Sequence, residues 1–294
     1  MERCALSRAH LSSDIEQTYF MKQIKKFFTC CLLVLSLGTV QAQDQLKVIT
    51  FNIKSFENTD FEVQPFADLL AAENADIICL NEVENRSARQ MVNMKYRDVV
   101  QDLASKMQLF GVFGYSYNLM NKQGDEEESK YTYCENELYG NAILSRYPIL
   151  NVNAMQLPRP AGSADQRGVV IADILLPSGK TVRVACTHLD HKGGQKEQAQ
   201  AVVSSVAGST IPTLVCGDMN QWPGTEVIDN VLSRSFDRLC SDEITYDHGN
   251  SKLDYIFGSM GRFELVETKV LNRYYYFTEL SDHHPVVSVV KFKN

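Results

Sequence analysis

Short apolar runs rich in β-branched residues recur along the chain, and longer stretches with helical periodicity separate several of them. Runs of this length are typical of buried strands. Strands that alternate with helices predict an α/β protein with two layers or more. The predicted strands lie at 46–53, 75–80, 110–117, 141–145, 169–176, 181–189, 211–218, 253–259 and 284–292, and the predicted helices lie near 62–73, 89–107, 195–207 and 223–233.

A single domain is expected from residue 44 to residue 294. The chain has 294 residues, enough for a sizeable core, and no repeat, flexible linker or change of composition divides this range. The full chain has a net charge of −7. An acidic body does not attract a phosphate backbone, so sequence-independent wrapping of nucleic acid is disfavoured. A local basic cleft or a bound divalent cation could override this charge.

The first 42 residues have the layout of a secretory signal. From Met21 a basic segment leads into an apolar run that begins at Phe27, and small residues around Ala42 form a cleavage site. The run is about half of the ~20 residues that span a bilayer, so a retained membrane anchor is disfavoured. We therefore expect translation to start at Met21, cleavage near Ala42, and a secreted or periplasmic protein without a stable membrane span.

The cysteines carry no metal or disulfide signature. Five cysteines follow residue 42, and neither a CxxC pair nor a close paired spacing joins them. Cys79, Cys186 and Cys216 stand in apolar runs, where a lone cysteine packs as a small apolar residue. The block Asp125–Glu128 is expected to be a solvated loop.

Polar residues stand where many of the apolar runs begin or end, and loops at the ends of strands are where chemistry is usually placed. If these ends converge, they bring together four carboxylates, two amides and up to three imidazoles. Such hard oxygen ligands suit Mg²⁺, Mn²⁺ or Ca²⁺ better than a structural zinc. The pattern predicts a metal-assisted phosphoesterase. The residues concerned are Asn52, Glu82, His188, Asp218, Asn220, Asp254, Asp282, His283 and His284.

Each residue taken alone also has a structural interpretation. Asn52 could cap local backbone, Glu82 could be solvated, and Asp218 could belong to a turn after Gly217. His188 shares a strand face with apolar residues and could be a core histidine. The strongest candidate is His283, because an imidazole accepts a proton near neutral pH and a separate carboxylate could fix its tautomer.

Eight motifs in order resemble one known family. They are TFN, NEVE, YGNAILSRYPI, QRG, THLDHKGG, GDMN, KLDYIFGS and SDHHP. Together they span about residues 46–292, and they resemble the endonuclease/exonuclease/phosphatase superfamily, the group related to deoxyribonuclease I. With its signal-like amino end, the chain resembles a secreted bacterial member. The resemblance implies a deoxyribonuclease-I-like four-layer α/β sandwich, with two packed mixed β-sheets flanked by helices and a divalent metal at one edge.

The resemblance also implies a role for each matching residue. Glu82, assisted by Asn52 and Asp282, matches the metal ligands. His283 matches the general base or phosphate-facing imidazole, and Asp254 its orienting partner. The remaining matches are Asp218 and Asn220 to the pair that positions water and phosphate, and His188 and Arg167 to phosphate contacts.

The expected reaction is hydrolysis of a phosphate ester by in-line attack of water, with Mg²⁺, Mn²⁺ or Ca²⁺ as the cofactor. The substrate stays open between a small phosphate ester, a nucleic acid and a phospholipid head group. It also stays open whether Asp218 or His283 takes the water's proton, and whether one metal or two is bound. No obligate protein partner is evident. The alternative is a non-catalytic binding protein on the same fold.

Overall fold

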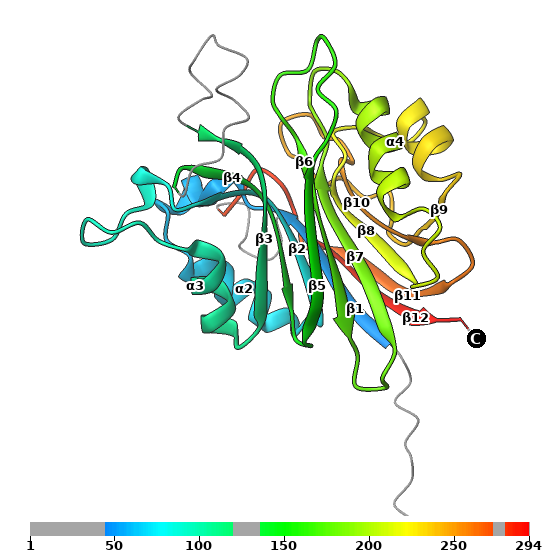
Figure 1. The fold of residues 1–294 in the computed structure, drawn as a ribbon, viewed down its shortest axis with the longest axis horizontal. Coiled ribbons are helices and arrows are strands. Elements are labelled where there is room, and N and C mark those ends of the chain that lie inside the picture. Colours follow the sequence, from blue (N-terminus) through cyan, green and yellow to red (C-terminus); the bar gives the residue numbers. More distant parts are fainter. Residues whose placement is uncertain (1–44, 120–135, 273–279, 294) are drawn as a thin grey trace, which may run out of the picture. The chain divides into compact units, whose positions relative to one another are not determined.

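The computed structural model describes residues 45–119, 136–272 and 280–293. The predicted signal segment, the acidic block and Cys134 lie outside these residues. The described strands form two six-stranded mixed sheets (Figure 1). In order across the first sheet they are β11 (Phe263–Val270), β12 (Val286–Phe292), β1 (Gln45–Asn52), β2 (Ile77–Asn85), β4 (Leu138–Ser145) and β3 (Phe110–Asn118).

The second sheet has the order β5 (Ile149–Gln156), β6 (Gly168–Leu175), β7 (Thr181–His188), β8 (Thr213–Asp218), β10 (Asp254–Ser259) and β9 (Phe236–Arg238). One parallel pair lies inside each sheet, β1 with β2 and β7 with β8. The neighbours of these pairs run antiparallel to them. In the first sheet, the amino end of β12 therefore lies at the same edge as the carboxyl ends of β1 and β2. In the second sheet, the amino end of β10 lies at the same edge as those of β7 and β8.

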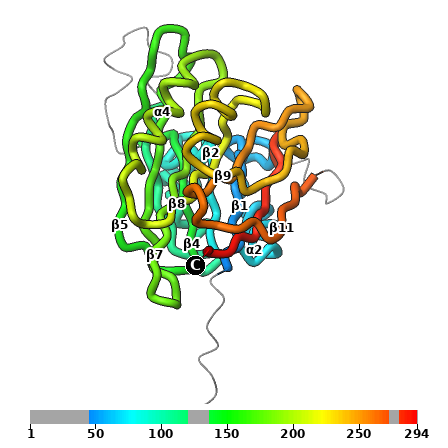
Figure 2. Tube along the Cα trace, turned by 90° about the vertical axis from the view of Figure 1, so that its right-hand side faces the viewer, coloured from blue at the N-terminus to red at the C-terminus, as the bar shows by residue number. Residues whose placement is uncertain are grey.

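Helices cover the outer faces of the two sheets. One apolar cluster joins the first sheet to α2 (Gln64–Glu73) and α3 (Val99–Met107), and a larger one joins the two sheets to each other and to α4 (Gln195–Val206). Figures 1 and 2 show α2 and α4 on opposite sides of the sheets. This confirms the predicted four-layer α/β sandwich. Shorter turns are η1 (Lys54–Thr59), η2 (Ala88–Gln90) and the π-helical η5 (Glu226–Leu232).

The predicted helix over 89–107 is wrong in its first half. The side chain of Asp98 accepts a hydrogen bond from the Gln101 N–H at 3.0 Å, so α3 begins only at Val99. Before it, Val92 and Lys95 pair across a tight turn. Three strands, β5, β9 and β11, were not predicted. The middle residues of β5 are all exposed, and those of β11 are exposed or half-buried, so neither edge strand has an apolar run.

Cys79, Cys186 and Cys216 are fully buried in the core between the sheets. This confirms that they pack as small apolar residues. Among the described residues, no helix is long and apolar enough to cross a membrane.

Candidate active site

The polar residues predicted at the ends of strands converge at one edge of the two sheets. Because β10 and β12 run antiparallel to β8 and β1, their first residues lie beside the last residues of those strands. Asp254, for example, pairs with Asp218, and His188 also pairs with Asp218. All of the predicted site residues are brought to this edge.

Asn52 links the two sheets at the centre of the edge. Its Nδ2 donates to Glu82 Oε1 at 3.1 Å and to Asp218 Oδ2 at 3.0 Å. Ser281 donates to the Asn52 carbonyl at 2.7 Å, which places the adjacent Asp282 beside the same strand. Asn52 is buried, so its amide acts as a fixed spacer between carboxylates of different sheets.

Glu82 owes its position to a β-bulge in β2. The pairing of β2 with β4 shifts between Leu80 and Val83, and Glu82 has a left-handed φ of 55°. Leu80 and Val83 both pack in the outer cluster, so Glu82 is the extra residue of the bulge. The sequence suggested that this strand ends before Glu82, but β2 continues to Asn85.

His283 lies between two buried carboxylates. Its Nδ1 is 2.9 Å from Asp254 Oδ2, and its Nε2 is 3.7 Å from Asp218 Oδ2. Because a carboxylate only accepts, the Asp254 contact places a proton on Nδ1 and orients the ring. Burial alone would lower the pKa of His283, but Asp254 and Asp218 together outweigh it and raise that pKa to about 10.

Asp218 is the buried carboxylate on which the site converges. Burial raises its pKa to about 7, with Asp254 adding to the effect and His283 opposing it. Its Oδ1 accepts from the Asn220 N–H at 2.8 Å, and Asn220 has a φ of 46°. Asp218 and Asn220 are therefore joined by a tight turn after β8, not by an extended segment.

His188 is held between Arg167 and Asp218. Arg167 Nη1 lies 3.0 Å from His188 Nδ1, and because a guanidinium only donates, Nδ1 accepts and Nε2 carries the proton. Nε2 lies 3.4 Å from Asp218 Oδ2, which can accept its proton, and 2.9 Å from Asn220 Nδ2, a donor that bonds to the Leu189 carbonyl. Burial and the Arg167 charge hold the pKa of His188 well below its usual value, so this imidazole is neutral at pH 7.

Arg167 is a buried cation with an unused donor. Its side chain is 5% exposed, and its Nε lies 3.8 Å from Asp190 Oδ2 without a hydrogen-bond partner among the described residues. Nη2 lies 3.4 Å from His191 Nδ1 and 3.7 Å from Asp165 Oδ2. A buried guanidinium with a free N–H suits a bound anion such as a phosphate.

A second cluster of metal-ligand types, Asp165, Asp190 and His191, lies beside Arg167. Asp190 Oδ1 accepts the N–H groups of Ala164, Lys192 and Gly193, and Oδ2 accepts that of Asp165. Asp190 thus connects the loop before β6 to the loop after β7, and both of its carboxylate oxygens already accept hydrogen bonds.

Sequence reasoning missed three side chains around Asp282 and His283. Lys54 Nζ lies 3.3 Å from Asp282 Oδ2, and His248 Nε2 lies 3.7 Å from the same oxygen. The ring of Tyr246 is 4.7 Å from that of His283. Tyr246 and His248 come from an irregular loop, so no hydrophobic period marked them. Their closeness to the KLDYIFGS motif was the only signal.

The donor set around Asn52 fits a hard divalent cation. Glu82 and Asp282 supply carboxylate oxygens, and Asn52 supplies an amide oxygen that accepts the Lys54 N–H at 3.1 Å in this structure. Mg²⁺ and Mn²⁺ prefer these ligand types. The carboxylates of Glu82 and Asp282 are half-buried, so each remains open to solvent on one side. A site with few protein ligands leaves room for water or a phosphate oxygen.

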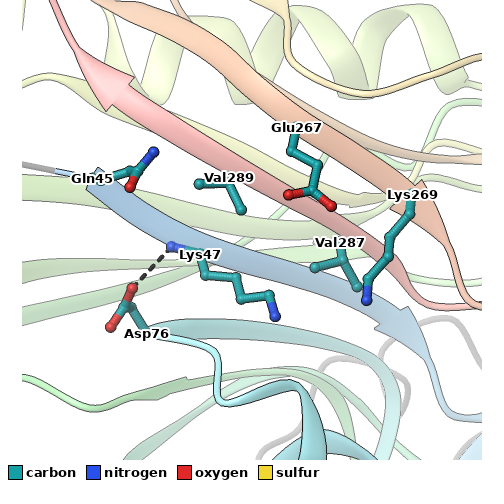
Figure 3. A pocket seen from close by; sticks show the side chains of 7 residues that line it. All are labelled: Gln45, Lys47, Asp76, Glu267, Lys269, Val287 and Val289. Atoms are coloured by element: carbon teal, nitrogen blue, oxygen red, sulfur yellow. Dashed lines mark hydrogen bonds between the residues drawn. The ribbon is translucent and has the colours of Figure 1, made fainter.

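A pocket of about 280 Å³ lies at the opposite end of β1. It is lined by residues of β1, β11 and β12, among them Lys47, Glu267 and Lys269 (Figure 3). Both lysines are paired with Glu73, at 2.9 Å and 3.0 Å. Because β1 begins here and ends at Asn52, this pocket is separate from the candidate active site.

The two-sheet sandwich, with its carboxylates, amides and imidazoles at one edge, defines the class of deoxyribonuclease-I-like proteins. The chain belongs to the Endonuclease/Exonuclease/phosphatase family, whose model matches residues 49–283. It is 29% identical to the uncharacterized protein YbhP of Escherichia coli K12 over 190 residues, which cover 61% of this chain and 68% of that one.

Two solved structures illustrate the shared fold. An endonuclease/exonuclease/phosphatase from Beutenbergia cavernae has a TM-score of 0.66 at 21% identity and covers 85% of this chain and 72% of its own. The mannosyl-6-phosphatase Bt3783 of Bacteroides thetaiotaomicron has a TM-score of 0.61 at 15% identity, covering 85% of this chain and 100% of its own. At these identities the likeness shows the fold, and members of the family are hydrolases of phosphate esters.

Proposed function

We propose that this protein is a divalent-metal-dependent phosphoesterase that hydrolyses phosphate esters by in-line attack of water. The observation that carries the proposal is the bonded chain of side chains at the sheet edge. Glu82, Asn52 and Asp218 are joined by one amide, and Asp218 faces both His188 and His283. Nothing in core packing requires two imidazoles and three carboxylates to meet at this edge.

The side chains divide into two groups. Asp218 is the group that can accept the proton of an attacking water, because the raised pKa keeps His283 protonated at pH 7, and Asp254 holds His283 in place. Arg167 and His188 present N–H groups on the side of the second sheet, where they stabilise charge that develops on phosphoryl oxygens. Glu82, Asn52 and Asp282 would hold the metal, which supplies Lewis-acid polarisation of a phosphoryl oxygen when bound.

The overall charge bears on the substrate. The chain carries a net charge of −7, which opposes long polyanions and favours a small phosphate ester or a phospholipid head group over a nucleic acid. A phosphatase of a sugar phosphate among the structural relatives supports small esters. We therefore propose a small phosphate mono- or diester as the substrate.

The test is turnover of residues 44–294 on duplex DNA, sphingomyelin, and small phosphate mono- and diesters, each with Mg²⁺ or Mn²⁺ and with a chelator. Metal-dependent cleavage of small esters is expected. Cleavage of DNA or sphingomyelin alone would move the proposal to that substrate. Activity that is indifferent to the chelator would reject the metal mechanism, and silence on all three would favour a binding protein.

The matched variants are Glu82→Gln and His283→Ala, with Glu264→Gln on an exposed face of β11 as the control. Loss of a transition-state contact is expected to lower kcat by about 100-fold or more in each site variant. The control should keep wild-type turnover. Near-normal kcat in either site variant would contradict the role given to that residue.

We also propose that residues 1–42 are removed and that the mature protein is secreted or periplasmic. The basic segment, the apolar run from Phe27 and the small residues near Ala42 support this. Expression of the full chain in a bacterial host, followed by mass measurement of the periplasmic fraction, tests it. A cytoplasmic protein that keeps its amino end would reject the proposal.

A further inference from the structure

Two buried amides, Asn81 of β2 and Asn141 of β4, lie directly beneath the candidate site. Asn81 is 0% exposed and Asn141 is 2% exposed. Asn81 Nδ2 donates to Asn141 Oδ1 at 2.8 Å, so the two side chains form a pair. Both strands belong to the first sheet, yet the remaining bonds of this pair go to the second sheet.

Three of those bonds end at a site residue or next to one. Asn81 Oδ1 accepts the backbone N–H of Asp218 at 3.0 Å. Asn81 Nδ2 donates to the carbonyl of Thr187, the residue before His188, at 2.8 Å. Asn141 Nδ2 donates to the carbonyl of Gly168, the residue after Arg167, at 2.9 Å. The pair therefore touches the strand ends that carry Asp218, His188 and Arg167.

The orientation of the pair follows from the groups it meets. A backbone N–H requires an acceptor, and the carbonyls of Thr187 and Gly168 require donors. An amide offers a donor and an acceptor on separate atoms, and turning the Asn81 amide over would place its NH2 against the Asp218 N–H and its oxygen against the Thr187 carbonyl. Because these groups are buried, a replacement without both functions leaves them unpaired.

We propose that Asn81 and Asn141 are positioning residues of the active site. Glu82 follows Asn81 directly in the bulge, so the pair couples the metal-ligand side of the site to Asp218, His188 and Arg167 on the other sheet. This rests on the proposed function and adds residues to its site. Neither asparagine touches the substrate, and both act through the backbone of the second sheet.

The experiment compares Asn81→Ala, Asn141→Ala and the double variant with Asn118→Ala. Asn118 is a matched control, because it is 2% exposed and donates to a backbone carbonyl at 3.0 Å, but β3 supplies no residue to the site. Displacement of catalytic groups by about 1 Å costs roughly 100-fold in rate, so kcat is expected to fall about 10- to 100-fold in each single variant, with KM changed far less.

The double variant separates a positioning pair from two independent losses. If the amides act as one unit, its kcat is expected to lie close to that of the worse single variant. Asn118→Ala should keep kcat within about threefold even where its loss of stability is similar. A fall in kcat no larger than in Asn118→Ala at equal stability would overturn the proposal. Asn141→Ala keeps this test available if Asn81→Ala does not fold.

Hydrogen exchange of the Asp218 backbone amide gives a readout without catalysis. Because Asn81 Oδ1 is its acceptor, exchange of this amide is expected to speed up about tenfold or more in Asn81→Ala and to stay unchanged in Asn118→Ala. If the wild-type protein hydrolyses no phosphate ester, the proposed function fails and this measurement alone decides the positioning role. Equal exchange in both variants would overturn it.

Discussion

The close approach of two strands at this edge determines which residue type can occupy one position, Gly217. Gly217 has a φ of 143°, and a Cβ built on it would overlap the carbonyl oxygen of Thr187 on the neighbouring strand. The close approach brings β7 and β8 together one residue before His188 and Asp218. Glycine is therefore required here by space as well as by conformation.

Gly217→Ala should lower the free energy of unfolding by about 2 kcal/mol or more, since a backbone atom cannot move aside for the new methyl group. The control is Gly179→Ala, where φ is 81° and no atom lies within 4 Å of the added Cβ. Strained backbone alone should cost about 1 kcal/mol there. Urea unfolding measures the loss of stability in both variants. Equal losses would show that the overlap with the Thr187 carbonyl adds no measurable cost.

Among the elements, α2 is tied to the first sheet through the last residue of the helix. Glu73 accepts from Lys47 of β1 at 2.9 Å and from Lys269 of β11 at 3.0 Å. Burial alone would raise the pKa of Glu73, but the hydrogen bonds from the two lysines outweigh it and lower that pKa below its usual value. A carboxylate with a lowered pKa stabilises the folded state only while it is ionised.

Glu73→Gln is expected to cost about 0.5–1 kcal/mol of stability at pH 7. The unfolded-state pKa of a glutamate is about 4.3, so the difference from wild type should persist above that pH and vanish as the pH falls through the lower folded-state pKa. Urea unfolding from pH 7 to about pH 3 checks this. Glu226→Gln, which breaks an ion pair whose carboxylate is 59% exposed, is the control and should change little.

At the scale of the whole molecule, the site joins two sheets whose strands are far apart in sequence. The bond from Asn52 to Asp218 spans 166 residues, and that from Ser281 to Asn52 spans 229. A cation held by Glu82, Asn52 and Asp282 would bridge segments that separate on unfolding. Metal binding should therefore stabilise the complete fold and not one loop.

Saturating Mn²⁺ is expected to raise Tm, because ligand at about 100 times its Kd adds about 2.7 kcal/mol to stability. That corresponds to roughly 5–10 °C for a domain of this size. The shift should disappear in Glu82→Gln combined with Asp282→Asn, and it should remain in Asp165→Asn, which alters the second cluster. Differential scanning calorimetry with and without EDTA provides the measurement. A shift lost only in Asp165→Asn would place the metal at the other cluster.

The sequence by itself predicted the strands of the core and the residues that the structure brings to one edge of the sheets. Apolar β-branched runs report burial locally, and their polar ends mark the residues that reach the sheet edge, as His188, Asp218 and Asp254 do. The order of the eight motifs indicated the family, and the resemblance to that family predicted the four layers of the fold. The edge strands β5 and β11 were not predicted, because exposed strands have no apolar run.

Only the tertiary structure decided how those residues meet. The bulge that turns out Glu82 depends on pairing between β2 and β4, and the Asn81 bonds join residues up to 137 positions apart. Tyr246 reaches His283 because its loop pairs with the chain before β12. Contacts between residues so far apart leave no periodic pattern in the sequence. They follow from strand register and the packing of one sheet on the other, which local sequence does not specify.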